Sequence, residues 1–243
     1  YEDAMNDYNT AISINPGEAY VYANRAITEA DMGDYKSAEK DYSKALIIDK
    51  ELLPAYLNRA IMREKLDDWE GAIEDCNMAI KLNMFSDDAY GLRGYLHFKE
   101  KKYHDAIEDY NKALKINPQN KRILMSRAIT WYEMKKFPEA MEDYTAVLKV
   151  DSTYAYAYYN RALLRAEIGE TNKAIDDLDQ VLEMNPDNIL IYFNRGLLKM
   201  EIRDYTGAYN DFSESISLYP DFVKAYLARA AVSGEMDDFA SAR

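Results

Sequence analysis

The stretch AYVYANRAITEADMGDYKSAEKDYSKALIIDKEL, residues 19–52, predicts how this chain folds. Its first 14 residues, AYVYANRAITEADM, carry apolar side chains at the spacing of one helix face. Gly33-Asp34 interrupts this pattern, and it resumes from Tyr35 to about Ile48. We therefore predict two helices joined by a short turn.

The same pattern recurs every 34 residues along the chain. One column of the repeat holds only arginine: Arg25, Arg59, Arg93, Arg127, Arg161, Arg195 and Arg229. A second holds only alanine: Ala4, Ala38, Ala72, Ala106, Ala140, Ala174, Ala208 and Ala242. A third holds only aspartate: Asp7, Asp41, Asp75, Asp109, Asp143, Asp177 and Asp211. Three unbroken columns without an insertion indicate an internal repeat.

The repeat divides the whole chain, residues 1–243, into one array without an internal domain boundary. Residues 1–18 form a half repeat and residues 223–243 a partial one. The full repeats are 19–52, 53–86, 87–120, 121–154, 155–188 and 189–222. Helices of about 14 residues are too short to be stable alone in water, so the pairs must stack on one another. Because the chain starts and stops within a repeat, we expect it to be a segment of a longer array.

These features resemble the tetratricopeptide repeat (TPR), in its bacterial type. Residues 155–188, AYAYYNRALLRAEIGETNKAIDDLDQVLEMNPDN, show the pattern well, although Thr171 stands where the family usually has an aromatic residue. The resemblance implies an all-α fold, a right-handed superhelical solenoid of helix-turn-helix units. It also implies that the first helix of each unit lines a concave face, and that the protein is an interaction scaffold.

Composition excludes several other classes of protein. The net charge of −13 disfavours nucleic-acid binding, which depends on clustered Lys and Arg. One cysteine cannot form an internal disulfide or a cysteine-based zinc site, and no segment approaches the roughly 20 apolar residues that would insert into a membrane. The histidines, His97 and His104, are separated by a predicted turn. We find no phosphate-binding loop or catalytic motif, and therefore expect no enzyme activity, cofactor or metal.

The arginine and aspartate columns are predicted to meet. Arg25 lies about eight residues before Gly33, and Asp41 lies eight residues after it, so the two side chains should be neighbours in an antiparallel pair of helices. A bidentate ion pair would satisfy both charges. We expect a structural ladder from Arg25, Arg59, Arg93, Arg127, Arg161 and Arg195 to Asp41, Asp75, Asp109, Asp143, Asp177 and Asp211. The alternative is a row of arginines that binds phosphates or carboxylates, but an aspartate for every arginine argues against it.

If the first helices line a concave face, the side chains on that face can be named. They include four asparagines, an apolar and aromatic set, and an edge that is acidic in the later units. The candidate peptide-binding groove is Asn24, Asn58, Asn160, Asn194, Tyr95, Phe98, Met125, Tyr132, Tyr159, Phe193, Glu133, Glu167 and Glu201. Apolar surface with a charged rim marks interaction sites. The alternative is that these side chains pack on each other.

We expect a protein or peptide partner, an extended apolar segment with basic residues toward the acidic edge. The acidic tails of heat-shock chaperones are excluded, because the column that should supply the first lysine of their binding site has none and the acidic edge would repel them. Two other readings stay open: a spacer that associates end to end, and the substrate-recruiting arm of a larger enzyme. No signal sequence is visible, and both a cytoplasmic location and export to the bacterial cell envelope are compatible with the sequence.

Overall fold

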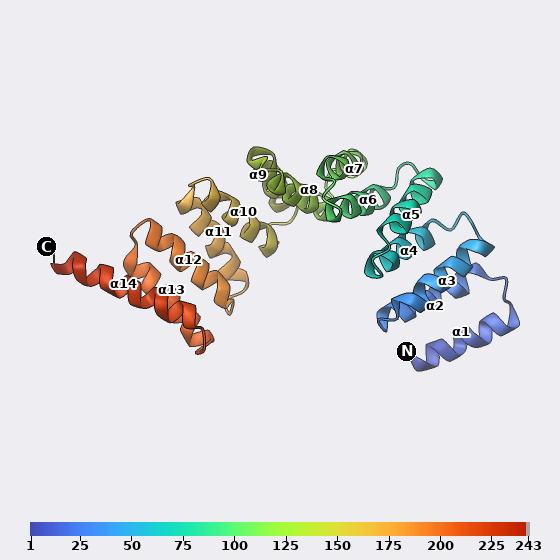
Figure 1. The fold of residues 1–243 in the computed structure, drawn as a ribbon, viewed down its shortest axis with the longest axis horizontal. Coiled ribbons are helices and arrows are strands. Elements are labelled where there is room, and N and C mark those ends of the chain that lie inside the picture. The colour runs from blue at the N-terminus through green and yellow to red at the C-terminus, as the bar shows by residue number, and fades with distance from the viewer. Residues whose placement is uncertain (242–243) are drawn as a thin grey trace. The chain divides into compact units, whose positions relative to one another are not determined.

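The computed structural model describes the backbone of residues 1–241 and the side chains of residues 1–236 (Figure 1). Ala242 of the alanine column lies outside this range. The described part is all-α, and the predicted all-α repeat solenoid is confirmed. Its helices are α1 (Glu2–Ile14), α2 (Ala19–Asp31), α3 (Tyr35–Ile48), α4 (Leu53–Lys65), α5 (Trp69–Leu82), α6 (Asp87–Lys99), α7 (Tyr103–Ile116), α8 (Lys121–Glu133), α9 (Phe137–Val150), α10 (Ala155–Glu167), α11 (Thr171–Met184), α12 (Ile189–Glu201), α13 (Tyr205–Leu218) and α14 (Val223–Ser241).

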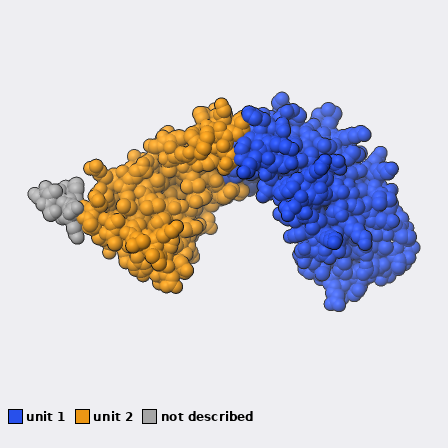
Figure 2. Space-filling model, in the orientation of Figure 1, with its two compact units in different colours: residues 1–130 blue, residues 131–243 orange. Residues whose placement is uncertain are grey.

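The chain packs as two compact units, residues 1–130 and residues 131–243, which we call unit 1 and unit 2 (Figure 2). The boundary falls within the sequence of α8. Consecutive helices contact one another from α1 to α7 in unit 1 and from α9 to α14 in unit 2, and the closest pairs are a first helix and the second helix that follows it. In unit 1 these pairs are α2 with α3, α4 with α5, and α6 with α7; in unit 2 they are α10 with α11 and α12 with α13.

A residue with positive φ stands in each turn between a first helix and its second helix. Gly33 (φ 83°) and Gly169 (φ 79°) adopt this conformation without a steric penalty, because glycine has no Cβ. Asp67, Lys101, Lys135 and Arg203 adopt it at φ values of 59° to 62°. The six positions are 34 residues apart or multiples of 34, so the turn is a fixed part of the repeat. In four repeats a side chain that disfavours this conformation occupies it.

Small residues allow the helices of a pair to approach closely. The described alanines of the alanine column from Ala38 to Ala208 are completely buried. On the facing helices, Gly94 lies against the Tyr110 ring and Gly196 against the Phe212 ring, so close that a Cβ on either glycine would come within 3.0 Å of ring carbons. Cys76 is buried in the same layer, and burial raises the pKa of its thiol to about 12. This thiol is a core residue without nucleophilic character at neutral pH.

Candidate functional site

The arginine column lies beside the aspartate column inside the helix pairs. In five pairs, Nε and Nη2 of the arginine donate to the two carboxylate oxygens of an aspartate 16 residues later, at 2.5 to 2.9 Å. These pairs are Arg25–Asp41, Arg59–Asp75, Arg93–Asp109, Arg161–Asp177 and Arg195–Asp211. Each of these aspartates is at most 6% exposed. Of the sixth predicted pair, Arg127 lies in unit 1 and buried Asp143 in unit 2.

The remaining guanidinium nitrogen of each arginine reaches back to the preceding second helix. Nη1 of Arg93 donates to Asn77 at 2.6 Å, and that of Arg127 donates to Asn111 at 2.6 Å. The acceptors form a polar column that we did not predict: Asn9, Ser43, Asn77, Asn111, Thr145, Asp179 and Ser213. The faces of six guanidinium groups lie 5.4 to 5.8 Å from the ring centroids of tyrosines three residues earlier. Arginines occupied in this way have little capacity left for an external anion.

A second charged column contacts the buried aspartates and differs between the units. In unit 2, Arg165 donates to Asp177 at 2.7 Å, and Lys199 lies 2.9 Å from Asp211. In unit 1, Arg63 has this role, but the same column holds Glu29 in the first full repeat. Burial and the neighbouring carboxylate of Asp41 raise the pKa of Glu29 to about 7. Its Oε2 is buried without a hydrogen-bond partner.

The four predicted groove asparagines differ in their surroundings. Asn24 is exposed. The Asn58 side chain lies near the Tyr42 hydroxyl. Asn160 donates its amide to the carbonyl oxygen of Tyr156 in the preceding turn of its own helix, at 2.7 Å. Asn194 is half-buried. The amide of Asn160 therefore already has a hydrogen-bond partner within the chain.

The predicted groove aromatics mostly pack on other rings. Phe98 contacts Tyr103 and Tyr132 contacts Phe137, with ring centroids 5.7 and 5.8 Å apart. Phe193 lies between two phenylalanines, with centroids 5.6 Å from Phe212 and 5.0 Å from Phe222. Each of these contacts joins a first helix to residues outside the first helices. These rings are half-buried, and part of each serves packing.

Met125 requires a correction to the predicted surface. Its side chain is only 4% exposed, so it lies in the interior of unit 1 and offers no surface to a partner. The sequence could not distinguish it from Leu57, which occupies the same column and is half-buried. Tyr95 and Tyr159 are half-buried, and each lines a surface cavity.

The predicted acidic edge is on the surface of unit 2. Glu133, Glu167 and Glu201 are exposed. The carboxylate of Glu167 accepts hydrogen bonds from the Tyr132 hydroxyl and from Lys135. Glu201 accepts one from Thr171 at 3.4 Å. In unit 1 the same column holds Asp31, Lys65 and Lys99, so this edge carries charges of both signs in unit 1 and only carboxylates in unit 2.

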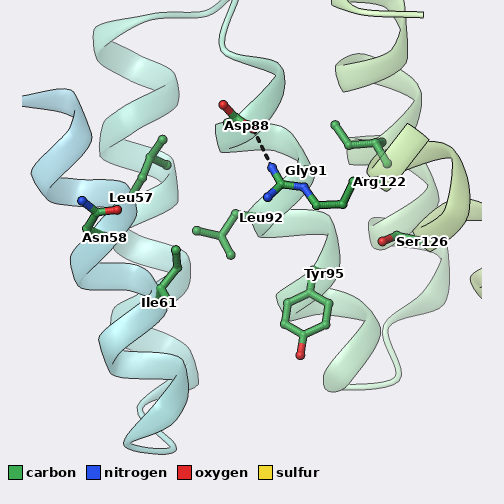
Figure 3. A pocket seen from close by; sticks show the side chains of 10 residues that line it. Leu57, Asn58, Ile61, Asp88, Gly91, Leu92, Tyr95, Arg122 and Ser126 are labelled. Atoms are coloured by element: carbon green, nitrogen blue, oxygen red, sulfur yellow. Dashed lines mark hydrogen bonds and ion pairs between the residues drawn. The ribbon is translucent and has the colours of Figure 1, made fainter. Parts of the chain in front are cut away.

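A cavity of about 460 Å³ opens between the first helices of unit 1 (Figure 3). Its walls come from α4, α6 and the unit 1 part of α8. Figure 3 shows Leu57, Ile61, Leu92 and Tyr95 around it, with Arg122 crossing it toward Asp88. The lining residues are Leu57, Asn58, Ile61, Asp88, Gly91, Leu92, Tyr95, Arg122, Ile123 and Ser126. Asp88 and Arg122 form an ion pair at 2.7 Å at its rim.

Unit 2 has a shallower cavity of about 330 Å³ where the start of α10 faces the start of α12 and the end of α11. Tyr156 and Leu190 border it and are 51% and 59% exposed. We did not predict these two residues. They share one column of the repeat with Asp88 and Arg122, three residues before the column of Leu57 and Tyr159. The helical period would have placed this column on the same face.

Other kinds of site are not found in the described part of the chain. Residues 1–236 contain no cluster of three or more His, Cys, Asp or Glu side chains that could bind a metal. His97 lies 3.8 Å from Asp109, and His104 lies on the exposed side of α7. None of the described helices has the length and apolar character that a membrane crossing requires.

Comparison with known protein families identifies this arrangement of paired helices. Family models described as tetratricopeptide repeat match residues 19–51, 87–120 and 155–188. The chain is a tetratricopeptide repeat protein. Proteins of this family are generally non-catalytic interaction modules, and a role as a protein-interaction scaffold is supported here. No curated protein sequence matches the chain significantly.

Solved structures of TPR proteins share the fold at low sequence identity. The C-terminal part of a TPR protein from Cytophaga hutchinsonii has a TM-score of 0.77 at 18% identity, covering 94% of each chain. The peptide-binding TPR protein YrrB has a TM-score of 0.59 at 22% identity, covering 76% of this chain and 95% of YrrB. A chain of the APC/C hetero-tetramer Cut9–Hcn1 has a TM-score of 0.69 at 16% identity, covering 95% of this chain. This TPR chain spans only 46% of that protein.

Proposed function

We propose that the protein binds an extended segment of a partner protein along the surface of its first helices, and that in unit 2 this segment is apolar and basic. The observation that carries the proposal is the combination of exposed apolar side chains and carboxylates on that surface. Tyr156 and Leu190, near the starts of α10 and α12, are more than half exposed. The exposed residues Glu167 and Glu201 end the same two helices, and Glu133 ends α8. Burial of apolar side chains would supply affinity, and the carboxylates would select basic residues.

The arginine–aspartate pairs are proposed to be a structural ladder. In each bidentate pair the two charges neutralise each other, and a tyrosine ring lies beside the guanidinium group. The pairs are therefore better suited to hold the two helices together than to bind a ligand. The same frame in every repeat supports the proposed array of a half repeat, six full repeats and a partial repeat. YrrB, whose fold is similar, is described as having an unusual peptide-binding site, which agrees with a peptide as the partner.

The test is selection from a random decapeptide display library on the full chain, followed by affinity measurement with synthetic peptides. We expect the peptides that bind unit 2 to combine apolar and basic residues. The double variant Tyr156→Ser, Leu190→Ser should weaken them at least tenfold, because it removes exposed apolar area without touching the buried layer. Charge reversal by Glu167→Lys together with Glu201→Lys should weaken the same peptides.

A matched control uses exposed apolar residues on second helices of the same unit. Val150 ends α9 and Leu218 ends α13, and both are exposed. The variant Val150→Ser, Leu218→Ser should leave peptide affinity unchanged, with helicity by circular dichroism equal in all variants. Equal affinities of the first-helix variant and the wild type would reject the proposal.

A further inference from the structure

The unit 1 cavity exists because one position of the repeat lacks a side chain. The column that contains Gly91 otherwise holds Ala23, Leu57, Met125, Tyr159, Phe193 and Leu227. Gly91 lies in the middle of α6, where glycine costs about 1 kcal/mol relative to alanine and no unusual φ requires it. A Cβ at this position would come within 2.9 Å of the Ile123 side chain. Glycine thus allows Ile123 to pack against α6 and form one wall of the cavity, and the absence of a side chain at residue 91 leaves the cavity itself unfilled.

The charged groups and the tyrosine hydroxyl in the lining are engaged by other groups of the chain. Asp88 and Arg122 neutralise each other across the rim (Figure 3). The Tyr95 hydroxyl donates to Glu64 at 3.3 Å. What faces the cavity is then mainly hydrocarbon, with the Asn58 amide and the Ser126 hydroxyl as its neutral polar groups. A charged group placed there would lose its hydration without gaining a partner, so the cavity favours an uncharged apolar group.

The volume is adequate for one large side chain. Engineered apolar cavities of about 150 Å³ already accept a benzene molecule. The unit 1 cavity is about 460 Å³ and open to solvent on one side. A leucine or an aromatic side chain would enter it from an extended backbone that lies across the first helices.

A lysine without a carboxylate partner lies beside the cavity. Nζ of Lys99 is 5.8 Å from the ring centroid of Trp69 and 6.0 Å from that of Tyr95, the tyrosine that lines the cavity. Among the described side chains, no Asp or Glu lies within 4.0 Å of this ammonium, although Lys65 in the same column pairs with Glu64 at 3.2 Å. The rings hold the charge near the cavity in a chain whose net charge is −13.

We propose that unit 1 binds a segment of a partner protein with one apolar side chain in the cavity and an aspartate or glutamate at Lys99. The charge complementarity is opposite to that proposed for unit 2. Extended chain spans about 3.3 to 3.6 Å per residue, so the acidic residue should lie about two positions from the apolar one. The inference rests on the proposed function for one point, that the partner is a protein segment.

The experiment uses the same decapeptide display library on the full chain. Among the selected peptides, one class should share an apolar residue and an acidic residue about two positions apart. Ile61→Trp fills the cavity from its exposed side and should lower the affinity of this class at least tenfold. Gly91→Leu should do the same, but it forces Ile123 to move, so Ile61→Trp keeps the test valid if that variant does not fold. Ile27→Trp is the matched control, since Ile27 is exposed in the same column of unit 1 and lines no described cavity.

The charge is tested by an exchange between the two partners. Lys99→Glu should weaken the acidic peptides at least tenfold, and a peptide with lysine in place of its acidic residue should regain affinity for that variant. Lys112→Glu makes the same change of net charge on α7 and should have little effect. Unchanged affinity in Ile61→Trp and Lys99→Glu would overturn the inference.

The outcomes also separate this inference from the proposed function. A library that yields only peptides sensitive to Tyr156→Ser, Leu190→Ser would overturn the unit 1 site and leave the proposed function standing. Failure to select any peptide on the wild-type chain would contradict both.

Discussion

Units 1 and 2 share a frame, by which we mean the buried aspartates with their bidentate arginines and the tyrosines beside them, but the units differ in their surface residues. Both contain the buried aspartates, the bidentate arginines and the stacked tyrosines at identical spacing. Unit 1 has a cavity next to Lys99, whereas unit 2 has exposed Tyr156 and Leu190 near the starts of its first helices and exposed glutamates at the ends of those helices. Thus the residues that build a repeat are constant along the chain, and the residues that give it a surface vary.

The units also differ in the charged residues that contact the buried aspartates. In unit 2, Arg165 and Lys199 each add a cation to an aspartate that already has an arginine. In unit 1 the same column begins with a carboxylate, Glu29, and continues with Arg63 and His97. The units should therefore agree in their response to loss of an aspartate and differ in their response to pH.

The largest effect is expected from removing an aspartate of the frame. Asp75→Ala in unit 1 and Asp177→Ala in unit 2 each leave the largely buried arginine of the bidentate pair without its carboxylate partner. A second arginine at each site loses one carboxylate and keeps another within 4.0 Å. We expect each to lower the free energy of unfolding by about 3–5 kcal/mol, measured by urea denaturation. The neighbouring exposed residues supply the controls, Glu74→Ala and Asp176→Ala, which should change it little. A loss in only one of the two units would break the comparison.

A smaller effect should distinguish the units by pH. The pKa of Glu29 is about 7 in the folded protein, above its ordinary value of 4.5, so the folded state binds a proton more tightly than the unfolded state. Its contribution to stability is complete below about pH 4.5 and is lost as pH rises through 7. We expect the helices α2 and α3 to lose about 1 kcal/mol of local stability between pH 5 and pH 8, a value reduced for partial exposure.

Hydrogen exchange of backbone amides, corrected for the intrinsic effect of pH, measures this loss. The helices α10 and α11 carry Arg165 in place of Glu29 and should show no such trend. Glu29→Gln should abolish the pH dependence in α2 and α3. A trend that persists in this variant would assign the effect to another group.

The smallest effect concerns the turns, where each unit has residues with positive φ. Asp67→Gly in unit 1 and Arg203→Gly in unit 2 remove the steric cost of a left-handed side chain, at φ values of 61° and 62°. Part of this gain is offset by the greater freedom of glycine in the unfolded chain. We expect a rise in the free energy of unfolding of about 0.5–1 kcal/mol for each, and Gly33→Ala should have the opposite sign. A decrease in either variant would contradict the assigned cost.

Much of the frame could be predicted from the sequence. Arg25 and Asp41 stand at matching distances from Gly33, and this symmetry alone indicated that they are neighbours. The polar column that begins with Asn9 and Ser43 was missed, because its members differ in type and share only a hydrogen-bonding oxygen. It could have been found by stepping 16 residues back from each arginine.

The candidate surface was harder to predict than the frame. The periodicity assigns a residue to a helix face, but whether that face is open depends on the neighbouring side chains. Met125 and Leu57 share a column, yet only Met125 is fully covered. The cavity depends on how closely Ile123 approaches Gly91, a contact between two repeats that no single repeat contains. Tyr156 and Leu190 were predictable in principle, since they lie one helical turn before a column that we did consider.

The reach of each arginine, 16 residues back and 16 residues forward, has a consequence for how such a gene can change. Arg59 binds Ser43 of the preceding repeat and Asp75 of its own, and Arg93 binds Asn77 and Asp109 in the same way. Duplication or loss of a 34-residue block joins equivalent positions and preserves both partners of every arginine. An insertion of any other length within a block would separate an arginine from one of them. Recombination can therefore lengthen or shorten this chain in whole repeats, and the arginine at each new boundary between repeats keeps both of its hydrogen-bond partners.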